Sequence, residues 1–320
     1  PLAKMVVEAR EINKARTTFI ESILKFSHRG RIHSDIHQMR SDQGGTVTGR
    51  FSYSNPNLQQ IPARNAILGP LIRSIFVPEK GCEWGIFDYS QQEPRLVVHY
   101  ASLQEFTGAS KFLDTYEEDD TTDFHQLVAD IANIPRKQAK SINLGLFYGM
   151  GKGKLMSQLG LNLEDAEEIL ATYHGKVPFV KQLMKDTMYK AGKKGYLRTL
   201  LGRRCRFDLW EPVNEWGQKA LPLKEAKDEY GEHMIKRAWT YKALNRLIQG
   251  SAADQTKKAM LELSKEGYVA HIQVHDELDF SIKNKKDQER IKEIMETCVE
   301  LAVPSRVDIE TGKSWGDAGT

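Results

Sequence analysis

Two aspartates, far apart in the sequence, have the chemistry of a metal site. Asp88 ends the apolar run CEWGIFDYS, which is typical of a buried strand, and Asp276 lies at the tip of a hairpin predicted in YVAHIQVHDELDFSIK. Two-residue hairpin turns favour Asn-Gly or Gly-X, whereas this turn would be His275 and Asp276, followed by Glu277. Taken singly, each aspartate at a strand end is more often a cap or turn residue. Together they would repel each other, and two Mg²⁺ ions would relieve that repulsion because hard cations prefer oxygen ligands.

A zinc site is the alternative interpretation of the hairpin. His271 and His275 share one face of a strand, and Asp276 follows them, so the three side chains could ligate Zn²⁺. This is the weaker hypothesis, since no Cys or third His accompanies the pair and the helical HExxH spacing is absent.

The stretch RKQAKSINLGLFYG predicts a helix with cations at one end of a face and an aromatic at the other. At 100° per residue, one continuous face would carry Asn143, Arg136, Phe147, Lys140, Leu144 and Tyr148. The opposite side, with Ile142, Leu146 and Ala139, would seat the helix on an apolar surface. Cations one turn apart suit a triphosphate and an aromatic suits its base, although a solvated surface helix is the commoner cause of such a pattern.

The elements that must position these residues indicate an α+β protein. Strands near the two ends of the chain, with helices between them, predict a sheet completed across a long insertion. Besides the strands around Asp88 and Asp276, we expect one long helix up to residue 26, loop and short strand over 41–65, a helix after 93, helices over 121–192, strand and turn over 195–207, a polar excursion over 209–232, and helices over 233–265 and 287–301.

Composition describes a soluble, intracellular, globular protein without a membrane segment. The 320 residues are 40% hydrophobic and 28% charged, no long uncharged apolar run or signal-peptide pattern occurs, and the three cysteines form no CxxC pair. The net charge is only +3, but residues 181–206 hold nine Lys and Arg against one acid, and residues 1–50 hold nine against five. These basic surfaces, separated by an acidic loop over 105–123, could line a nucleic-acid duplex.

Taken together, these motifs resemble the family A DNA polymerases over essentially the whole chain. DYSQQEPR is similar to the family's first catalytic motif, RKQAKSINLGLFYG to its nucleotide-binding helix and QVHDEL to its second catalytic motif. TGRFSYSNPNLQQIPAR and NRLIQGSAAD resemble two template-primer motifs, and SWGDA resembles the family's ending. Any one motif could arise by chance, whereas all of them in the family's order are specific.

The resemblance implies a right-hand polymerase fold with an antiparallel palm sheet and helical fingers. Residues 1–45 would be a thumb remnant and its connection, 46–104 and 216–320 the two parts of the palm, and 105–215 the fingers. The chain would begin within the second long thumb helix, so most of the thumb and the upstream domains would be missing, and no proofreading exonuclease is recognisable. We expect a monomer in the cytoplasm of a bacterium or a phage-infected host.

Carried over by motif, Asp88 and Asp276 would bridge two Mg²⁺ ions, for which Mn²⁺ could substitute, and Glu277 would support them. Arg136 and Lys140 would grip the phosphates of a dNTP, Lys140 would also protonate the leaving group, and His125 would add a phosphate contact.

Further residues around the nucleotide and the DNA follow from the same motifs. Tyr148 would lie under the nascent base pair, Glu93 would press on the sugar at C2′, and Gln91 would belong to the nucleotide site. Leu144 stands where the family often has Phe or Tyr, and two other departures are Pro94 and Tyr241. The side chains expected to face a primer-template duplex are Arg50, Gln59, Arg64, Asn245, Gln249 and His275.

The expected function is therefore template-directed DNA synthesis on a primer 3′-hydroxyl, with release of pyrophosphate. A single-subunit RNA polymerase is the alternative enzyme, although Glu93 argues against an enzyme that needs ribonucleotides. The third hypothesis is a catalytically inactive nucleic-acid-binding module. The joint presence of Asp88, Asp276, Arg136 and Lys140 argues against it.

Overall fold

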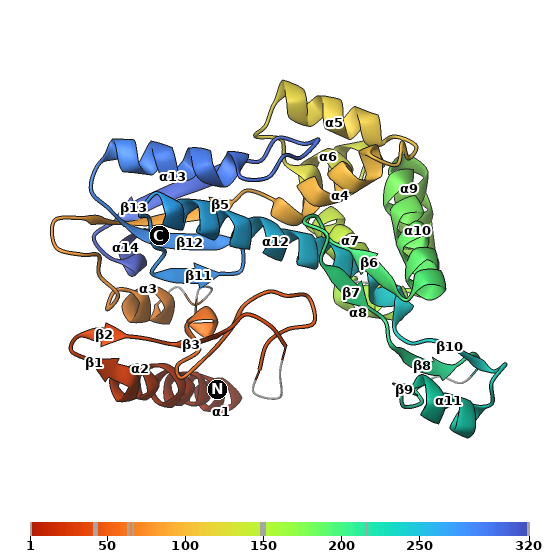
Figure 1. Ribbon diagram of the computed structural model, residues 1–320, viewed down its shortest axis with the longest axis horizontal. Coiled ribbons are helices and arrows are strands. Elements are labelled where there is room, and N and C mark those ends of the chain that lie inside the picture. The colour runs from red at the N-terminus through yellow and green to blue at the C-terminus, as the bar shows by residue number, and fades with distance from the viewer. Residues whose placement is uncertain are drawn as a thin grey trace. The chain divides into compact units, whose positions relative to one another are not determined.

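The chain folds into two compact units that are not colinear with the sequence. The computed structural model describes residues 2–40, 44–62, 65, 67–147, 152–214 and 217–318. One unit comprises Pro1–Ser90, Thr256–Val299 and Val307–Thr320, and the other comprises Gln91–Gln255 and Glu300–Arg306. We call them the sheet unit and the helical unit (Figure 1). The palm and finger boundaries predicted at 104 and 215 do not coincide with the boundaries between these units, and they stay a prediction.

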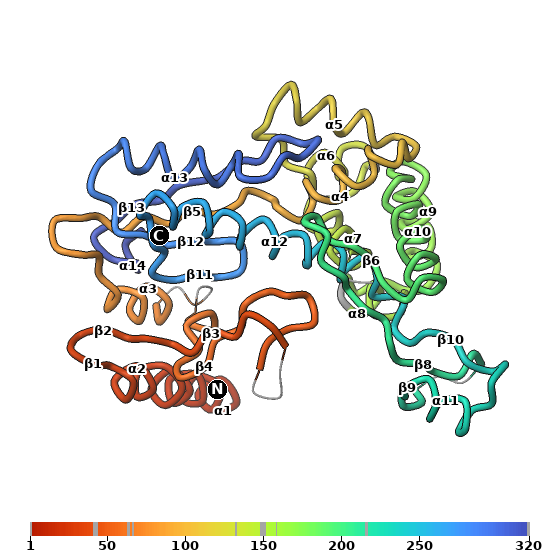
Figure 2. The backbone as a smooth tube through the Cα atoms, viewed as in Figure 1, coloured from red at the N-terminus to blue at the C-terminus, as the bar shows by residue number. Residues whose placement is uncertain are grey.

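A four-stranded antiparallel sheet forms the centre of the sheet unit. Its order is β11 (Ile272–Val274), β12 (Glu277–Ile282), β5 (Glu83–Tyr89) and β13 (Val307–Gly312). Figure 2 shows the early strand β5 lying between two strands from the C-terminal quarter of the chain. The predicted α+β class, with a sheet completed across a long insertion, is confirmed.

The two faces of this sheet differ in chemistry because successive side chains along each strand point to opposite faces. Phe87 on β5 faces the same side as Leu278 and Ile309, its partners in register, and this face packs on the last turns of α12 (Ala243–Lys265) and on α13 (Lys285–Thr297). On the other face, Trp84 and Ile86 pack in a second apolar cluster. That second face also carries Asp88 of β5, Glu277 and Asp279 of β12, and Asp308 and Glu310 of β13.

The second face is covered by N-terminal elements and by the last helix of the chain. The N-terminal elements are α1 (Leu2–Lys14), which does not itself reach the core, a π-helical turn (Ala15–Ile20), α2 (Glu21–Phe26), strand pairs β1 (Ser27–His28) with β2 (Arg31–Ile32) and β3 (Asp35–His37) with β4 (Ser52–Ser54), a 3₁₀ turn (Leu58–Gln60) and α3 (Leu68–Arg73). The last helix is α14 (Trp315–Ala318). The long helix predicted up to residue 26 is confirmed.

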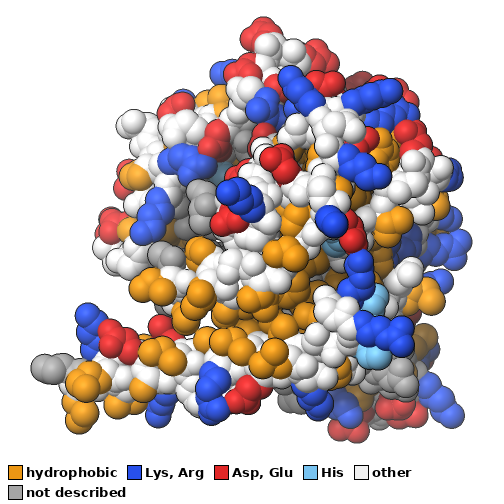
Figure 3. Space-filling view, turned by 90° about the vertical axis from the view of Figure 1, so that its left-hand side faces the viewer, with side chains coloured by type: hydrophobic (Ala, Val, Ile, Leu, Met, Phe, Trp, Pro, Cys, Tyr) orange, Lys and Arg blue, Asp and Glu red, His pale blue; other side chains and the backbone are white. Residues whose placement is uncertain are grey.

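Helix α1 itself is exposed all round. Its continuation contributes Phe19 and Ile23 to the core, one turn apart, whereas no residue of α1 is buried. Its apolar side chains therefore face solvent, and Figure 3 shows hydrophobic groups along this helix at the bottom of the view. The exposed apolar residues of α1 are Leu2, Met5, Val6, Val7 and Ile12.

The helical unit contains the predicted run of helices around an aromatic core. Its helices are α4 (Gln92–Ser102), α5 (Ala109–Glu118), α6 (Phe124–Ala132), α7 (Arg136–Phe147), α8 (Lys152–Leu159), α9 (Leu163–Lys176), α10 (Pro178–Lys194), α11 (Leu223–Tyr230) and the first part of α12. Phe112, Phe124, Phe147 and Phe179 pack against one another at its centre. The predicted strand and turn over 195–207 is the hairpin of β6 (Tyr196–Arg198) and β7 (Arg204–Arg206).

Three predictions of local structure were wrong. The acidic segment 105–123 contains helix α5 rather than only loop, because Phe112 and Tyr116, one turn apart, bury one side of it. The polar excursion is a small sheet of β8 (Leu209–Pro212), β9 (Leu221–Pro222) and β10 (Ile235–Arg237) with α11. Since β10 pairs with β8, the following helix begins at Ala243 and not at 233. Strand β13 was not predicted.

Among the residues that the structure describes, no helix has both the length and the apolar character to cross a membrane.

Close packing between α14 and α3 makes Gly316 a sensitive position. A Cβ there would lie 2.4 Å from the Pro70 carbonyl oxygen and 2.7 Å from the Ser74 nitrogen. We expect Gly316→Ala to lose about 1–3 kcal/mol of stability, measured as a lower Tm in a thermal melt. Gly192→Ala on α10 is the control: nothing lies within 4 Å of the added methyl, and helix propensity predicts a gain of up to ~1 kcal/mol. An unchanged Tm for Gly316→Ala would contradict this packing.

Candidate active site

The strand register gathers acidic side chains at one end of the sheet. Asp88 on β5 is the direct partner of Glu277 on β12 and of Asp308 on β13, so the three side chains share one face. Asp276 precedes Glu277, and its carbonyl oxygen accepts a hydrogen bond from the Tyr89 N–H at 3.3 Å. The structure thus brings Asp88 and Asp276 to adjacent strand ends, and it adds Asp308, which sequence reasoning missed. The alternating sequence VDIETG was the available signal for its strand.

The turn that presents Asp276 is held in an unusual conformation. Val274 pairs with Glu277, so His275 and Asp276 form a two-residue turn, and His275 has a φ of 59°. A left-handed residue other than Gly costs of order 1 kcal/mol and persists only where its surroundings enforce it. Here the Gln273 side chain donates to the His275 carbonyl at 2.5 Å, and Gln59 donates to Gln273 Oε1 at 3.0 Å. Gln59 therefore braces this turn.

Mutual repulsion disfavours ionisation of the acidic cluster. Burial among protein atoms, followed by repulsion from Asp276, Glu277, Asp308 and Glu310, raises the pKa of Asp88 to about 8, although its side chain is open to solvent on one side. Burial also raises the pKa of Asp276, against which Arg50 acts. A divalent cation bound between these oxygens would remove the repulsion.

The donor set fits Mg²⁺ rather than a transition metal. Carboxylate oxygens are the ligands that this hard cation prefers, and it is usually held by one or two carboxylates plus substrate phosphates. Within the described ranges, no group of three or more His, Cys, Asp or Glu side chains is arranged to hold a metal. Asp88 and Asp276 could therefore hold ions only together with oxygens from a ligand or water.

The zinc hypothesis is wrong for the hairpin as it folds. His271 Nε2 lies 2.7 Å from Ser281 Oγ, and its ring packs near Trp84 at 6.0 Å between centroids. His275 is in the turn, where the left-handed conformation breaks the alternation of the strand. His271, His275 and Asp276 accordingly do not form a metal-binding group.

Glu277 is directed at the protein interior as well as at Asp88. It lies on the same face of β12 as Asp279, which is fully buried. Burial raises the pKa of both carboxyls, and Arg73 opposes the shift in both. The Arg73 guanidinium lies 4.3 Å from the centre of a Trp315 ring. This environment suits the supporting part expected of Glu277.

Helix α7 of the helical unit carries the predicted phosphate-binding cations. Arg136 and Lys140 are exposed and one turn apart. Arg136 Nε donates to Asp123 Oδ2 at 2.9 Å. Asp123 also caps α6 by accepting from the His125 N–H at 2.8 Å, and although burial alone would raise its pKa, Arg136 and these N–H groups hold it below the usual value. Arg136 is thus already paired with an anion.

The open face predicted for this helix is narrower than the sequence suggested. Asn143 and Phe147, expected on the face with the cations, are completely buried. The reason is that α6 and α9 pack on that side, where Phe147 meets Phe124 and Asn143 meets His125. Leu144 is half-buried, and Tyr148 lies outside the described residues.

Three other predicted nucleotide contacts occupy the start of α4 and of α6. His125 is buried, its Nδ1 lies 2.9 Å from Asn143 Nδ2, and burial together with Lys140 and Arg136 lowers its pKa to about 4 against the pull of Asp123. Gln91 donates to the Thr122 carbonyl at 3.0 Å and accepts from the Phe124 N–H at 2.8 Å, so its amide ties the two helix starts together. Glu93 is half-buried in the first turn of α4.

The predicted primer-template residues fall in both units. Arg50 is half-buried in the sheet unit, and its carbonyl oxygen accepts from Thr46 Oγ1 at 2.8 Å. Asn245 and Gln249 are half-buried, one turn apart on α12, in the helical unit. Arg64 lies outside the described residues.

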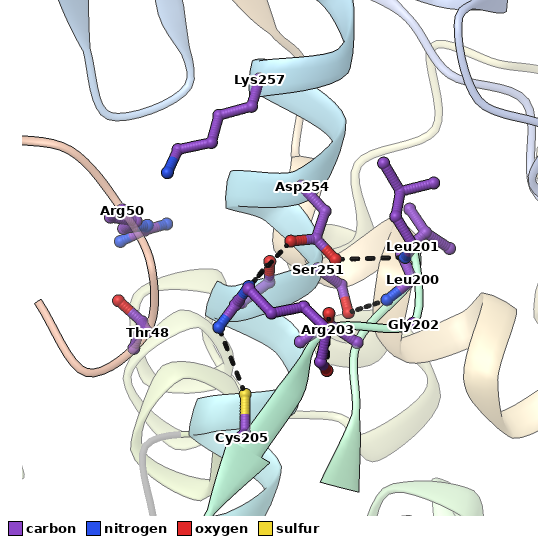
Figure 4. Close-up of polar contacts among 12 residues, drawn as sticks. Thr48, Arg50, Leu200, Leu201, Gly202, Arg203, Cys205, Ser251, Asp254 and Lys257 are labelled. Carbon is purple, nitrogen blue, oxygen red and sulfur yellow. Dashed lines mark hydrogen bonds and ion pairs between the residues drawn. The ribbon is translucent and has the colours of Figure 1, made fainter. Parts of the chain in front are cut away.

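Sequence reasoning missed how the basic hairpin is fixed to α12. Asp254 Oδ2 accepts from the Leu201 N–H at 3.1 Å and Oδ1 from Arg203 Nε at 3.1 Å, while Ser251 Oγ accepts from the Leu200 N–H at 3.1 Å (Figure 4). An acid within the buried face of a helix was the signal, because such a group needs partners. The hairpin is thereby held rigidly and exposes Arg198, Arg204 and Arg206.

Comparisons with known proteins show which family the chain resembles. The model of DNA polymerase family A matches residues 1–317. A DNA-directed DNA polymerase of Pseudomonas phage M6 is 39% identical over 99% of this chain and 51% of its own length, and DNA polymerase I of Geobacillus stearothermophilus is 35% identical over 99% and 35%. The chain spans about half the length, or less, of these relatives.

A solved structure resembles the chain closely. The POL domain of Pol1 from M. smegmatis, in complex with DNA primer-template and dNTP, aligns with a TM-score of 0.78 and 29% identity over 97% of this chain and 53% of that one. This likeness confirms the polymerase fold expected from the sequence.

The raised pKa of Asp88 predicts how stability depends on pH without a metal. The folded protein keeps this proton up to about pH 8, whereas the unfolded chain releases it near 3.8, so the carboxyl costs more stability as pH rises through that window. In EDTA at pH 7.5 we expect Asp88→Asn to gain about 1 kcal/mol, after discounting for solvent screening, and to converge with the parent below pH 4.

Thermal melts with and without Mg²⁺ check this prediction. Mg²⁺ should raise the Tm of the parent and leave that of Asp88→Asn unchanged. Asp114→Asn, an exposed acid on α5, is the control and should behave as the parent. A metal-free Asp88→Asn that melts below the parent at pH 7.5 would show that the cluster is not repulsive.

Proposed function

Since this chain belongs to DNA polymerase family A, we propose that it catalyses template-directed DNA synthesis, adding dNTPs to a primer 3′-hydroxyl and releasing pyrophosphate. The observation that carries the proposal is the strand register that sets Asp88 beside Asp276 and Glu277 at one end of the sheet. Two carboxylates on rigid strands are the arrangement that paired metal ions require for displacement at a phosphate.

Family A DNA polymerases generally use divalent metal ions. We propose two Mg²⁺ ions, replaceable by Mn²⁺, held by Asp88 and Asp276. When bound, the ions would lower the pKa of the primer hydroxyl and stabilise the negative charge on the phosphates. Asp88 and Asp276 would hold them from adjacent strand ends, and the hydrogen bonds of Gln273 and Gln59 fix the turn that carries Asp276.

The helical unit supplies the cations for the triphosphate. Arg136 and Lys140 bind phosphate oxygens and neutralise the charge that grows on them, and Lys140 donates a proton to the leaving pyrophosphate. Arg136 exchanges Asp123 for the nucleotide when it binds. His125 adds a neutral hydrogen-bond donor, and Gln91 holds the starts of α4 and α6 together. Glu93 would exclude the 2′-hydroxyl of a ribonucleotide, and Tyr148 would stack under the base.

We propose a primer-template DNA duplex as the partner, as in the complex of the mycobacterial relative. Arg50, His275, Asn245 and Gln249 would face the duplex near the primer terminus, with Gln59 and Arg64 toward the template. Donors there meet minor-groove acceptors that look alike for all correct pairs, so they report pairing geometry and not sequence. The exposed arginines of the β6–β7 hairpin add contacts to the DNA backbone. The sheet unit would correspond to most of the palm and to the thumb remnant. We propose that the protein acts as a monomer in the cytoplasm.

A primer-extension assay on a primed DNA template tests the function. With Mg²⁺, the parent should extend with dNTPs and not with rNTPs, since Glu93 blocks the 2′-hydroxyl. Asp88→Ala should lose about three orders of magnitude in rate, several kcal/mol of transition-state stabilisation, while Asp114→Ala should match the parent. Extension with rNTPs alone would favour an RNA polymerase, no extension an inactive binding module, and full activity of Asp88→Ala would remove the metal assignment.

Leu144 predicts how the enzyme treats the 3′ side of the sugar. A half-buried leucine provides neither a hydroxyl nor an aromatic surface at a position where the family often has Phe or Tyr. We expect Leu144→Tyr to raise the kcat/KM for dideoxynucleotides relative to dNTPs by about tenfold or more, since a hydrogen-bonding group there is worth 1–3 kcal/mol. Leu144→Met is the size-matched control, and equal ratios in Leu144→Tyr and the parent would refute the assignment.

A further inference from the structure

A chain of buried polar groups runs across three helices of the helical unit. Tyr173 on α9 is completely buried, and its hydroxyl donates to Asn143 Oδ1 on α7 at 2.6 Å. Asn143, also completely buried, places its Nδ2 2.9 Å from Nδ1 of His125 on α6. Three polar side chains inside an aromatic core are costly unless each is satisfied, so their order of donors and acceptors is constrained.

The direction of the protons follows from the buried phenol. A phenol hydroxyl that is removed from water must donate its proton, and in the described part of the chain the acceptor offered to Tyr173 is Asn143 Oδ1. That contact fixes the orientation of the Asn143 amide, whose Nδ2 must then donate to His125 Nδ1. A neutral imidazole with an accepting Nδ1 carries its proton on Nε2.

The surroundings of His125 keep the ring neutral and oriented. The charged groups that face it are Asp123 at the start of its own helix and Arg136 and Lys140 from α7, while α9 contributes the uncharged Tyr173. Phe124 meets the imidazole edge to face at 6.0 Å between ring centroids. No residue in the described ranges is hydrogen-bonded to Nε2, which leaves this N–H for a ligand.

We propose that Tyr173 and Asn143 are positioning residues that fix His125 as the Nε2–H tautomer, so that a neutral N–H is offered to the triphosphate beside Arg136 and Lys140. The inference rests on the proposed function for the identity of the ligand, but its statement about the tautomer does not. A lone pair on Nε2 would instead repel the phosphate oxygens, and only a protonated ring could then donate.

The tautomer can be observed directly by ¹⁵N–¹H NMR of the full chain with labelled histidine. At pH 7.5 the spectrum of the parent should show His125 protonated on Nε2 and bare on Nδ1, with assignment by loss of the signal in His125→Ala. In Tyr173→Phe the Asn143 amide loses its donor and can turn Oδ1 toward the imidazole, which moves the proton to Nδ1. A proton on Nδ1 in the parent would overturn the proposal, whatever reaction the protein catalyses.

The pH dependence of dNTP binding separates positioning from a general loss of structure. For the parent on a primer-template, KM for dNTP should carry no contribution from His125 titration between pH 6 and 8.5, since this imidazole stays neutral there. Tyr173→Phe should bind dNTP about tenfold more weakly at pH 8 and keep its kcat. Binding should recover as pH falls toward the pKa of the ring, which lies higher in this variant than in the parent because Asn143 Oδ1 then accepts the hydrogen bond from Nδ1–H and favours the protonated ring. A loss that is equal at all pH values would indicate a structural effect and overturn the proposal.

Two further variants keep the test decisive. Asn143→Asp retains the acceptor for Tyr173, draws the imidazole proton to Nδ1 and, through its carboxylate, raises the pKa of His125 above that of the parent. In this variant dNTP binding should therefore weaken as pH rises through that pKa. This test is independent of whether Tyr173→Phe folds. Tyr116→Phe, elsewhere in the same core, should match the parent, because it removes a buried hydroxyl that has no hydrogen-bond partner among the described residues.

A double-mutant cycle completes the experiment. In His125→Ala, adding Tyr173→Phe should cost no further dNTP affinity, because both changes remove the same N–H. Additive losses would overturn the proposal. A parent that neither binds dNTP nor extends a primer would refute the proposed function, while the NMR result would still decide the tautomer.

Discussion

Repulsion between carboxylates at the end of one sheet is the constraint on which the rest of the structure depends. Asp88 is flanked by acids on both neighbouring strands, Glu277 and Asp308, and Asp276 stands next to them in the turn. Backbone pairing of β5 with β12 and β13 fixes this arrangement, and the apolar residues on the opposite face of the same strands stabilise it. The protein therefore uses hydrophobic burial on one face to hold acidic groups together on the other, and the proposed metal ions would relieve their repulsion.

The sequence predicted the two aspartates and their shared chemistry, but only part of the geometry. A hairpin at His275 and Asp276 could be recognised because its turn residues are unfavourable there, and strand β5 because its apolar run is unbroken. The register could not be predicted, since β5 pairs with strands that lie more than half the length of the chain away. Asp308 was missed for the same reason: a short alternating segment acquires meaning only when its partner strand is known.

The helix RKQAKSINLGLFYG shows a different limit of sequence reasoning. Its periodicity correctly gave a helix with Arg136 and Lys140 exposed, and it placed Asn143 on the same open face. Helical periodicity predicts which residues share a face of the helix, but it does not predict which part of that face another element covers. Helices α6 and α9 cover Asn143, and a polar residue expected to meet solvent becomes the middle of a buried chain from Tyr173 to His125. The functional assignments rested on family motifs because neither periodicity nor burial distinguishes a ligand contact from a packing residue.

The ion pair between Arg136 and Asp123 has a consequence for the influence of ionic strength on the nucleotide. If Arg136 binds the nucleotide as proposed, an incoming phosphate would have to replace an anion that the protein already provides, and the released carboxylate would remain the cap of helix α6. Added salt screens the internal pair as well as the attraction between arginine and phosphate, so the two effects partly cancel. In the proposed function, nucleotide binding by this arginine would accordingly be less sensitive to ionic strength than binding by an unpaired cation.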